Sequence, residues 1–283
     1  MMKKKSLIYL FLSFLSFLIS FLIAYYTKID TIVNAVLLAF ILQWIFFLPA
    51  YYFQTEKFFD ISGSLTYILL VIYVFCNHYA IMGLDLGNII LSFLILTWTF
   101  RLGIFLFLRV KRNRKDRRFD LIKKSPTKFF MTWTLQAMWV TMCSLCALVG
   151  IYNGIKINLF FYIGIIFFFI GFLIEVIADN QKIKFRMNPK NKNKFIQSGL
   201  WYYSRHPNYL GEIILWFGIS IISFSSLKGM QLMTLISPFF TYFLLVYVSG
   251  VRILEDSAEK KWGHLQSYRD YVKKTPVLFF NKE

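Results

Sequence analysis

Long runs of apolar residues dominate the chain, and shorter polar stretches separate them. Eight runs are about 20 residues long, the length at which an α-helix crosses the hydrocarbon core of a bilayer. They fall at about 7–27, 29–51, 62–82, 86–108, 128–151, 157–181, 208–227 and 230–251. Strands of a membrane barrel would instead alternate over about 10 residues. The pattern therefore predicts an all-α, polytopic membrane protein with about eight transmembrane helices.

Positive charge is distributed unequally between the two ends of these runs. The chain carries 32 Lys and Arg against 14 Asp and Glu, a net charge of +18. Arg101 lies within a run, and every other basic residue except Lys28, Lys156 and Lys228 falls on one side. Cytoplasmic loops are the ones enriched in Lys and Arg. We therefore expect both termini in the cytoplasm.

The densest basic stretch is the run 111–118, which we interpret as an anchor at the lipid headgroups. Membrane lipids are thus expected partners, whereas nucleic acid is not, because no base-reading fold is visible outside the membrane. The pair Cys143 and Cys146 has no second pair or nearby His to complete a zinc site, so no metal is predicted.

Ionisable residues are costly inside a membrane, and the second half of the chain concentrates them. Glu175, Asp179, Lys182 and Arg186 follow the spacing of one helical face, so they form a polar stripe where the sixth run ends. An ion-pair network along the helix would explain such a stripe. It does not explain, however, why Glu175 and Asp179 lie so far inside the apolar run.

The segment 199–212 is the richest in candidate chemistry, with Arg205, His206, Asn208 and Glu212 around Pro207. Pro207 is suited to the first turn of a helix, where its missing N–H costs nothing. Asn208 and Glu212 then share a face, and Gly211 allows another group to approach closely. A helix N-terminus flanked by Arg and His favours an anion.

After the eighth run comes an amphipathic segment, 252–271, with Leu254, Ala258, Trp262 and Leu265 on one face. It predicts a cytoplasmic helix that lies at the membrane interface. Alternatively, this helix forms a lid over a headgroup or a cofactor.

These motifs resemble the steroid 5-alpha-reductase C-terminal-domain superfamily, and most closely its bacterial branch, a domain of unknown function. The resemblance is carried by Glu175 with the run Ala178 to Lys182, by Gly199 to Glu212, and by Trp216-Phe217-Gly218. Leu210 and Phe217 are mild departures from the family pattern. The resemblance covers about 175–280 well and 56–130 more weakly, which predicts an N-terminal membrane region at 1–127 and a reductase-like domain at 128–283.

The resemblance implies a membrane-embedded reductase that binds NADPH and reduces a C=C bond of a lipophilic substrate, steroid-like or another enone. Cofactor-binding roles are implied for Asp179, Lys182, Arg186, Arg205, His206, Asn208, Glu212, Arg252 and Glu255. The basic residues are suited to phosphate, and the carboxylates of Asp179 and Glu212 to ribose hydroxyls or an amide. Catalytic candidates are Glu56, Tyr203 and Tyr209, although no motif locates the expected Glu–Tyr pair.

The same residues also fit a second function. Isoprenylcysteine-type membrane methyltransferases have a similar Arg-His-Pro-x-Tyr-x-Gly core for S-adenosylmethionine, here Arg205 to Gly211. Asn208, Glu212 and the upstream run 178–182 favour the reductase. A lipid-binding or scaffold protein without activity is the third possibility, and the oligomeric state is open.

Overall fold

A computed structural model describes residues 2–113 and 119–280, and this part of the chain contains helices and no strand. Eight of its helical stretches are long and apolar enough to cross a membrane, which confirms the predicted fold class. The predicted headgroup anchor at 111–118 lies outside the residues whose side chains are described.

The chain divides into two compact units, 1–158 with 222–237, and 159–221 with 238–283. The fifth helix thus lies in the first unit, whereas the predicted division into a membrane region at 1–127 and a reductase-like domain at 128–283 stays a prediction. The fifth helix belongs to the first unit because it contacts the four helices before it.

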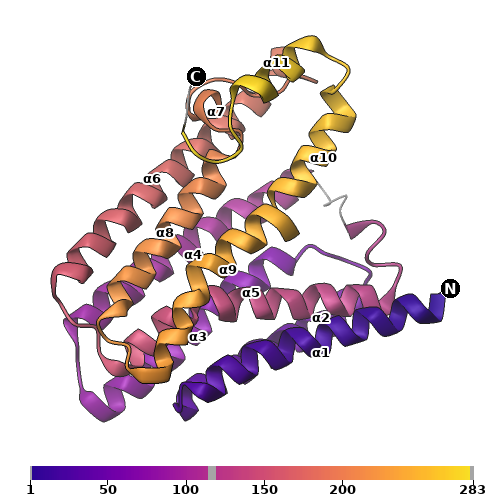
Figure 1. Ribbon diagram of the computed structural model, residues 1–283. Helices are drawn as coiled ribbons and strands as arrows, with labels where there is room; N and C mark the ends of the chain where they lie inside the picture. The colour runs from indigo at the N-terminus through magenta and orange to yellow at the C-terminus, as the bar shows by residue number, and fades with distance from the viewer. Residues whose placement is uncertain (1, 114–118, 281–283) are drawn as a thin grey trace. The chain divides into compact units, whose positions relative to one another are not determined.

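The first unit is built around one central helix. Its long helices are α1 (Met2–Tyr26), α2 (Asp30–Tyr52), α3 (Phe59–Met82), α4 (Leu86–Asn113) and α5 (Pro126–Asn153). Helix α5 packs against the other four, and α1 and α2 run alongside it (Figure 1). It is buried at nearly every position from Val140 to Ile151, as expected for a helix that is surrounded on all sides.

Polar side chains join the helices inside this unit. Gln43 on α2 donates to Thr66 Oγ1 on α3 at 2.8 Å, and Gln136 on α5 donates to the Phe59 carbonyl at 2.6 Å. On the loop between α2 and α3, the buried carboxylate of Glu56 forms an ion pair with Lys123. Hydrogen bonds of this kind link helices in an apolar environment where burial alone supplies little driving force.

The second unit rests on two closely packed helices, α6 (Leu159–Met187) and α8 (Pro207–Phe224), which lie side by side (Figure 1). Gly211 faces the Glu175 amide and the Gly171 carbonyl, and Gly218 faces the Phe168 amide and the Gly164 carbonyl. A Cβ at either glycine would lie only 2.6 Å from the facing amide nitrogen. We call these contacts the glycine seam; they bring the two backbones together, as small residues do in membrane helix pairs.

The part of the chain that connects α6 to α8 contains the 3-10 helix η2 (Pro189–Asn191) and the short helix α7 (Leu200–Tyr203). Helix α8 begins at Pro207, as the sequence predicted.

The eighth run is not one continuous α-helix. It consists of the 3-10 helix η3 (Gly229–Leu235), α9 (Ile236–Phe243) and the π-helix η4 (Leu244–Val248). Ser249 and Gly250 then separate it from α10 (Val251–Trp262). Gly250 lies against the Leu245 carbonyl. A Cβ at this position would also lie 3.0 Å from the Tyr209 ring, so a larger residue would not fit here.

The amphipathic segment after this run forms two helices where the sequence suggested one. Helix α10 ends at Trp262, and α11 (Gln266–Lys274) follows after a turn at Gly263 to Leu265.

Candidate functional site

A cleft of about 210 Å³ lies within the second unit, between the end of α6, the segment before α8, and helices α10 and α11. Among the residues that the structure describes, five basic side chains, one carboxylate, one histidine and several aromatic rings line it. These include Lys182, Arg186, Lys194, Arg205, Lys261, Glu255, His206, Trp201, Phe195, Trp262, Tyr268 and Tyr271. The excess of basic over acidic groups makes the cleft attractive to an anion.

One wall of the cleft is formed by Lys182 on α6 and Trp201 on α7. The ammonium group of Lys182 lies 4.3 Å from the centre of the Trp201 ring, and the indole N–H donates to the Ala178 carbonyl at 3.1 Å. A cation above an indole face is an attractive pair, and the hydrogen bond fixes the ring. Together they hold the Lys182 charge at the cleft wall.

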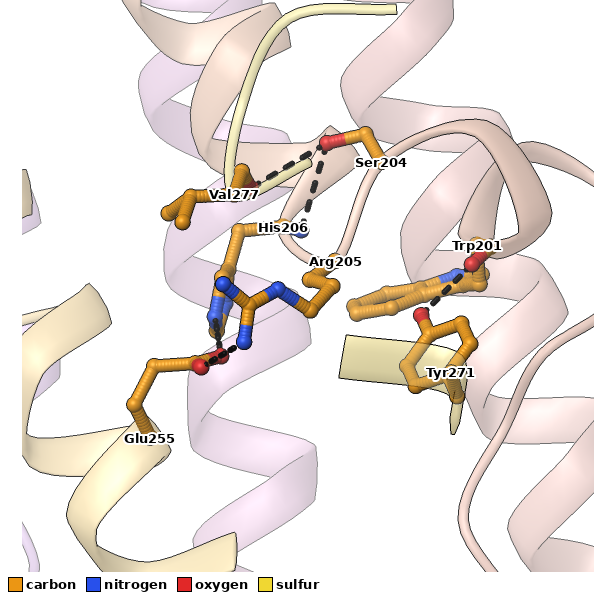
Figure 2. Close-up of polar contacts among 7 residues, drawn as sticks. All are labelled: Trp201, Ser204, Arg205, His206, Glu255, Tyr271 and Val277. Carbon is orange, nitrogen blue, oxygen red and sulfur yellow. Dashed lines mark hydrogen bonds and ion pairs between the residues drawn. The ribbon is translucent and has the colours of Figure 1, made fainter. Parts of the chain in front are cut away.

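The charged centre of the cleft is a cluster of Arg205, His206 and Glu255. Glu255 on α10 accepts from Arg205 Nη1 through one carboxylate oxygen, and its other oxygen lies 2.6 Å from His206 Nε2. Figure 2 shows the guanidinium and the imidazole converging on this carboxylate. The charge of Arg205 is thus already compensated, which differs from the expectation that Arg205 and His206 jointly attract an anion.

His206 is buried, and this burial lowers its pKa below the usual 6.5. Lys182 and Arg205 lower the pKa further, whereas Glu255 opposes them through its hydrogen bond and its charge. A neutral imidazole donates from one nitrogen only, and an ionised carboxylate only accepts. The Nε2 of His206 therefore carries the proton, and Nδ1 is left as an acceptor.

Three buried polar atoms in and beside the cleft have no hydrogen-bond partner among the described residues. They are Arg205 Nε, His206 Nδ1 and Asn208 Oδ1. Buried polar groups in folded proteins are nearly always paired. Arg205 Nε and His206 Nδ1, a donor and an acceptor on residues that line the cleft, are groups that a polar ligand would satisfy.

A cluster of aromatic residues also lines the cleft. The Phe195 ring lies between those of Trp262, Tyr268 and Tyr271, with ring centres 5.2–5.9 Å apart. Trp262 also donates to the Asn193 carbonyl at 2.6 Å, so the loop after α6 is attached to the end of α10. Burial raises the pKa of Tyr271, whose neutral hydroxyl donates to the Trp201 carbonyl at 2.6 Å.

The structure brings five of the predicted cofactor residues into the lining of the cleft: Lys182, Arg186, Arg205, His206 and Glu255. Asp179, Asn208, Glu212 and Arg252 do not line it. Asp179 and Glu212 are buried in α6 and α8, and Arg252 is exposed on α10.

The three catalytic candidates lie in different surroundings. Glu56 belongs to the first unit, where it is engaged by Lys123. Tyr203 is 45% exposed and packs edge-on against Tyr202. The Tyr209 ring stacks on His206, with centres 5.8 Å apart. The catalytic roles of all three stay predictions.

Several lining residues were not selected from the sequence, notably Trp201, Phe195, Tyr268 and Tyr271. Aromatic residues are abundant throughout the chain, so composition gives them no prominence. A sequence signal existed only for Tyr268 and Tyr271. These two lie one helical turn apart in the amphipathic segment, so they share a face.

Comparison with known proteins was made at the level of families, curated sequences and solved structures. A family model described as "Protein of unknown function (DUF1295)" matches residues 46–275, which is most of the chain. No solved structure matches significantly.

Two curated relatives are similar over part of the chain. A probable 7-dehydrocholesterol reductase of Acanthamoeba polyphaga mimivirus is 30% identical over 143 residues, 43% of this chain and 28% of the relative. The probable O-methyltransferase ustE of Ustilaginoidea virens is 33% identical over 69 residues, 24% of each protein. The similarity thus spans only about a quarter of the length of these relatives.

Proposed function

Because the chain belongs to the DUF1295 family, within the steroid 5-alpha-reductase-like group, we propose that it is an NADPH-dependent membrane reductase. The proposed substrate is a lipophilic molecule with an electron-poor C=C bond, such as a steroid-like enone. Similarity to a probable 7-dehydrocholesterol reductase supports an oxidoreductase. We further propose that it works in a bacterial inner membrane with both termini in the cytoplasm.

The observation that carries this proposal is the basic, aromatic-lined cleft beside Arg205 and His206. NADPH combines phosphate groups with flat rings, and such a ligand is matched by basic side chains and aromatic walls. Whole ligand pockets of enzymes usually measure about 300–1,000 Å³. At about 210 Å³, the cleft is suited to one part of a dinucleotide.

Each side chain then has a distinct role. Lys182, Arg186 and Lys261 hold the phosphates by charge-assisted hydrogen bonds. Neutral His206 accepts a hydrogen bond at Nδ1, from a hydroxyl or an amide N–H of the ligand. When bound, the nicotinamide ring of NADPH supplies a hydride to the substrate.

S-adenosylmethionine is the competing ligand, and the partial match to the O-methyltransferase together with Arg205-His206-Pro207-x-Tyr209-x-Gly211 favours it. Its sulfonium and ammonium groups are positive. A cleft lined by five basic residues and one carboxylate is a poor environment for them. The reductase is therefore our first choice.

A thermal-shift titration of the detergent-purified protein tests the proposal. NADPH, NADH and S-adenosylmethionine are added in parallel, because a ligand that binds only the folded state must stabilise it. We expect Lys182→Ala and Arg186→Ala to weaken NADPH binding about 10- to 100-fold each, the usual contribution of a hydrogen bond to a charged group.

Lys184→Ala is the matched control. Lys184 lies on the same helix between the two, is exposed and does not line the cleft, so its loss removes the same charge without a ligand contact. A shift with S-adenosylmethionine alone would overturn the reductase in favour of the methyltransferase. Equal weakening by all three variants would mean that the cleft is not the cofactor site.

A further inference from the structure

The backbone just before α8 is hydrogen-bonded to a segment that is distant in the sequence. The 275–278 segment, which follows α11, runs beside residues 204–206. Its Pro276 carbonyl accepts from the Arg205 amide at 2.9 Å, and its Val277 carbonyl accepts from the His206 amide at 3.1 Å. Figure 2 shows the contact between Ser204 and Val277.

Side chains add three more links. Ser204 Oγ donates to the Val277 carbonyl at 3.3 Å and accepts from the His206 amide at 3.3 Å. Thr275 donates to the Tyr202 carbonyl, and Tyr271 donates to the Trp201 carbonyl. The stretch from Trp201 to His206 is therefore attached at successive positions to a part of the chain about 70 residues away.

The segment is also anchored by apolar burial. Leu278 is 5% exposed and packs with Leu210 of α8 and Val251 of α10. Ser204 is fully buried and Thr275 nearly so, which leaves little room for these groups to rearrange. Hydrogen bonds shielded from water in this way are costly to break.

We infer that the 275–278 segment is a positioning element of the cleft, which sets where the side chains of Arg205 and His206 meet Glu255. The residues at the start of α8 do not fix the positions of Arg205 and His206 by themselves. Ser204 is in an extended conformation, and Pro207 has no backbone N–H to donate. The consequence for cofactor binding rests on the proposed function, whereas the positioning itself does not.

Two variants test the inference. Deletion of residues 276–283 removes both carbonyl acceptors, and deletion of 281–283 is its control. The full-length double variant Ser204→Ala/Thr275→Val removes the side-chain links of Ser204 and Thr275, keeps that of Tyr271, and leaves the chain intact. It serves where the longer deletion fails to fold, as judged by circular dichroism and size-exclusion chromatography.

The first readout is the NMR titration of His206 without any cofactor, assigned by comparison with His206→Gln among the three histidines of the chain. In the wild type and the short deletion we expect titration below the usual 6.5, since His206 is buried. In the long deletion we expect a shift back toward that value. A purely stabilising segment would leave the titration of the folded molecule unchanged.

The second readout is amide hydrogen exchange of the peptide that contains Arg205 and His206. We expect exchange to become about tenfold faster in the double variant, the effect of losing a typical hydrogen bond. Unchanged exchange in a folded double variant, or unchanged His206 titration in a folded long deletion, would overturn the inference. Since neither readout uses NADPH, failure of the proposed function would appear separately, as a wild type that does not bind it.

Discussion

The glycine seam makes a sharp prediction at Gly211. A methyl group there would lie 2.6 Å from both the Glu175 amide nitrogen and the Gly171 carbonyl oxygen. Ordinary contact for a Cβ begins at 3.4 Å. Both neighbours are backbone atoms that no side-chain rotation can move, so Gly211→Ala must separate α6 from α8 by about 0.8 Å.

The expected cost follows from two opposing effects. Overpacking costs about 1–3 kcal/mol, and alanine gains about 1 kcal/mol over glycine within a helix. Because rigid backbone lies on both sides, we take the upper end and expect a net loss of about 2 kcal/mol in the free energy of unfolding. For a chain of this size that corresponds to a melting temperature lower by about 4–8 °C.

Moving α6 away from α8 should also change the cleft, because Lys182 on α6 and His206 at the start of α8 both line it. We expect NADPH affinity to fall more than the lost stability alone would explain, since small misplacements of binding groups are costly. The assay is thermal unfolding in detergent, with and without NADPH. Phe217→Leu is the control, because the half-exposed Phe217 contacts Phe167 of α6 only through its ring and the change adds no bulk between the two backbones. Wild-type melting and affinity in Gly211→Ala would refute the close packing of the seam.

Two further predictions concern the charged cluster and the topology. Glu255→Gln should cost about 1.5–3 kcal/mol at pH 7.5, because Arg205 loses its charged partner. Since the pKa of folded His206 is lowered, the unfolded state takes up the proton first, and stability is lost as pH falls below 6.5. Glu255 raises that pKa, so the variant should lose more stability than the wild type between pH 7.5 and 5.5; parallel pH profiles would contradict this. A reporter fused at the C-terminus should report the cytoplasm, and a periplasmic signal would contradict the proposed orientation.

Features that depend on local sequence were predictable. The lengths of the apolar runs predicted the spans, and the start of α8 followed from the fixed geometry of Pro207. Close approach at Gly211 was also anticipated, because only a residue without a side chain allows it.

Features that depend on distant contacts were not predictable. Nothing in the apolar run 230–251 signals a π-helix, since the residues that form it, Leu244 to Val248, are as apolar as those of an ordinary transmembrane helix. The pairing of Arg205 and His206 with Pro276 and Val277 uses backbone atoms, which leave no trace in residue identity. Compensation of Arg205 by Glu255 likewise became visible only when α10 was placed beside it.

The confinement of the cleft to one unit has a consequence for how this protein can diversify. In the part of the chain that the structure describes, every residue that lines the cleft belongs to the second unit. Substitutions in α1 to α5 can therefore accumulate without altering a single side chain that lines the cleft. The chemical groups that face a ligand in the cleft are therefore set by the second unit alone.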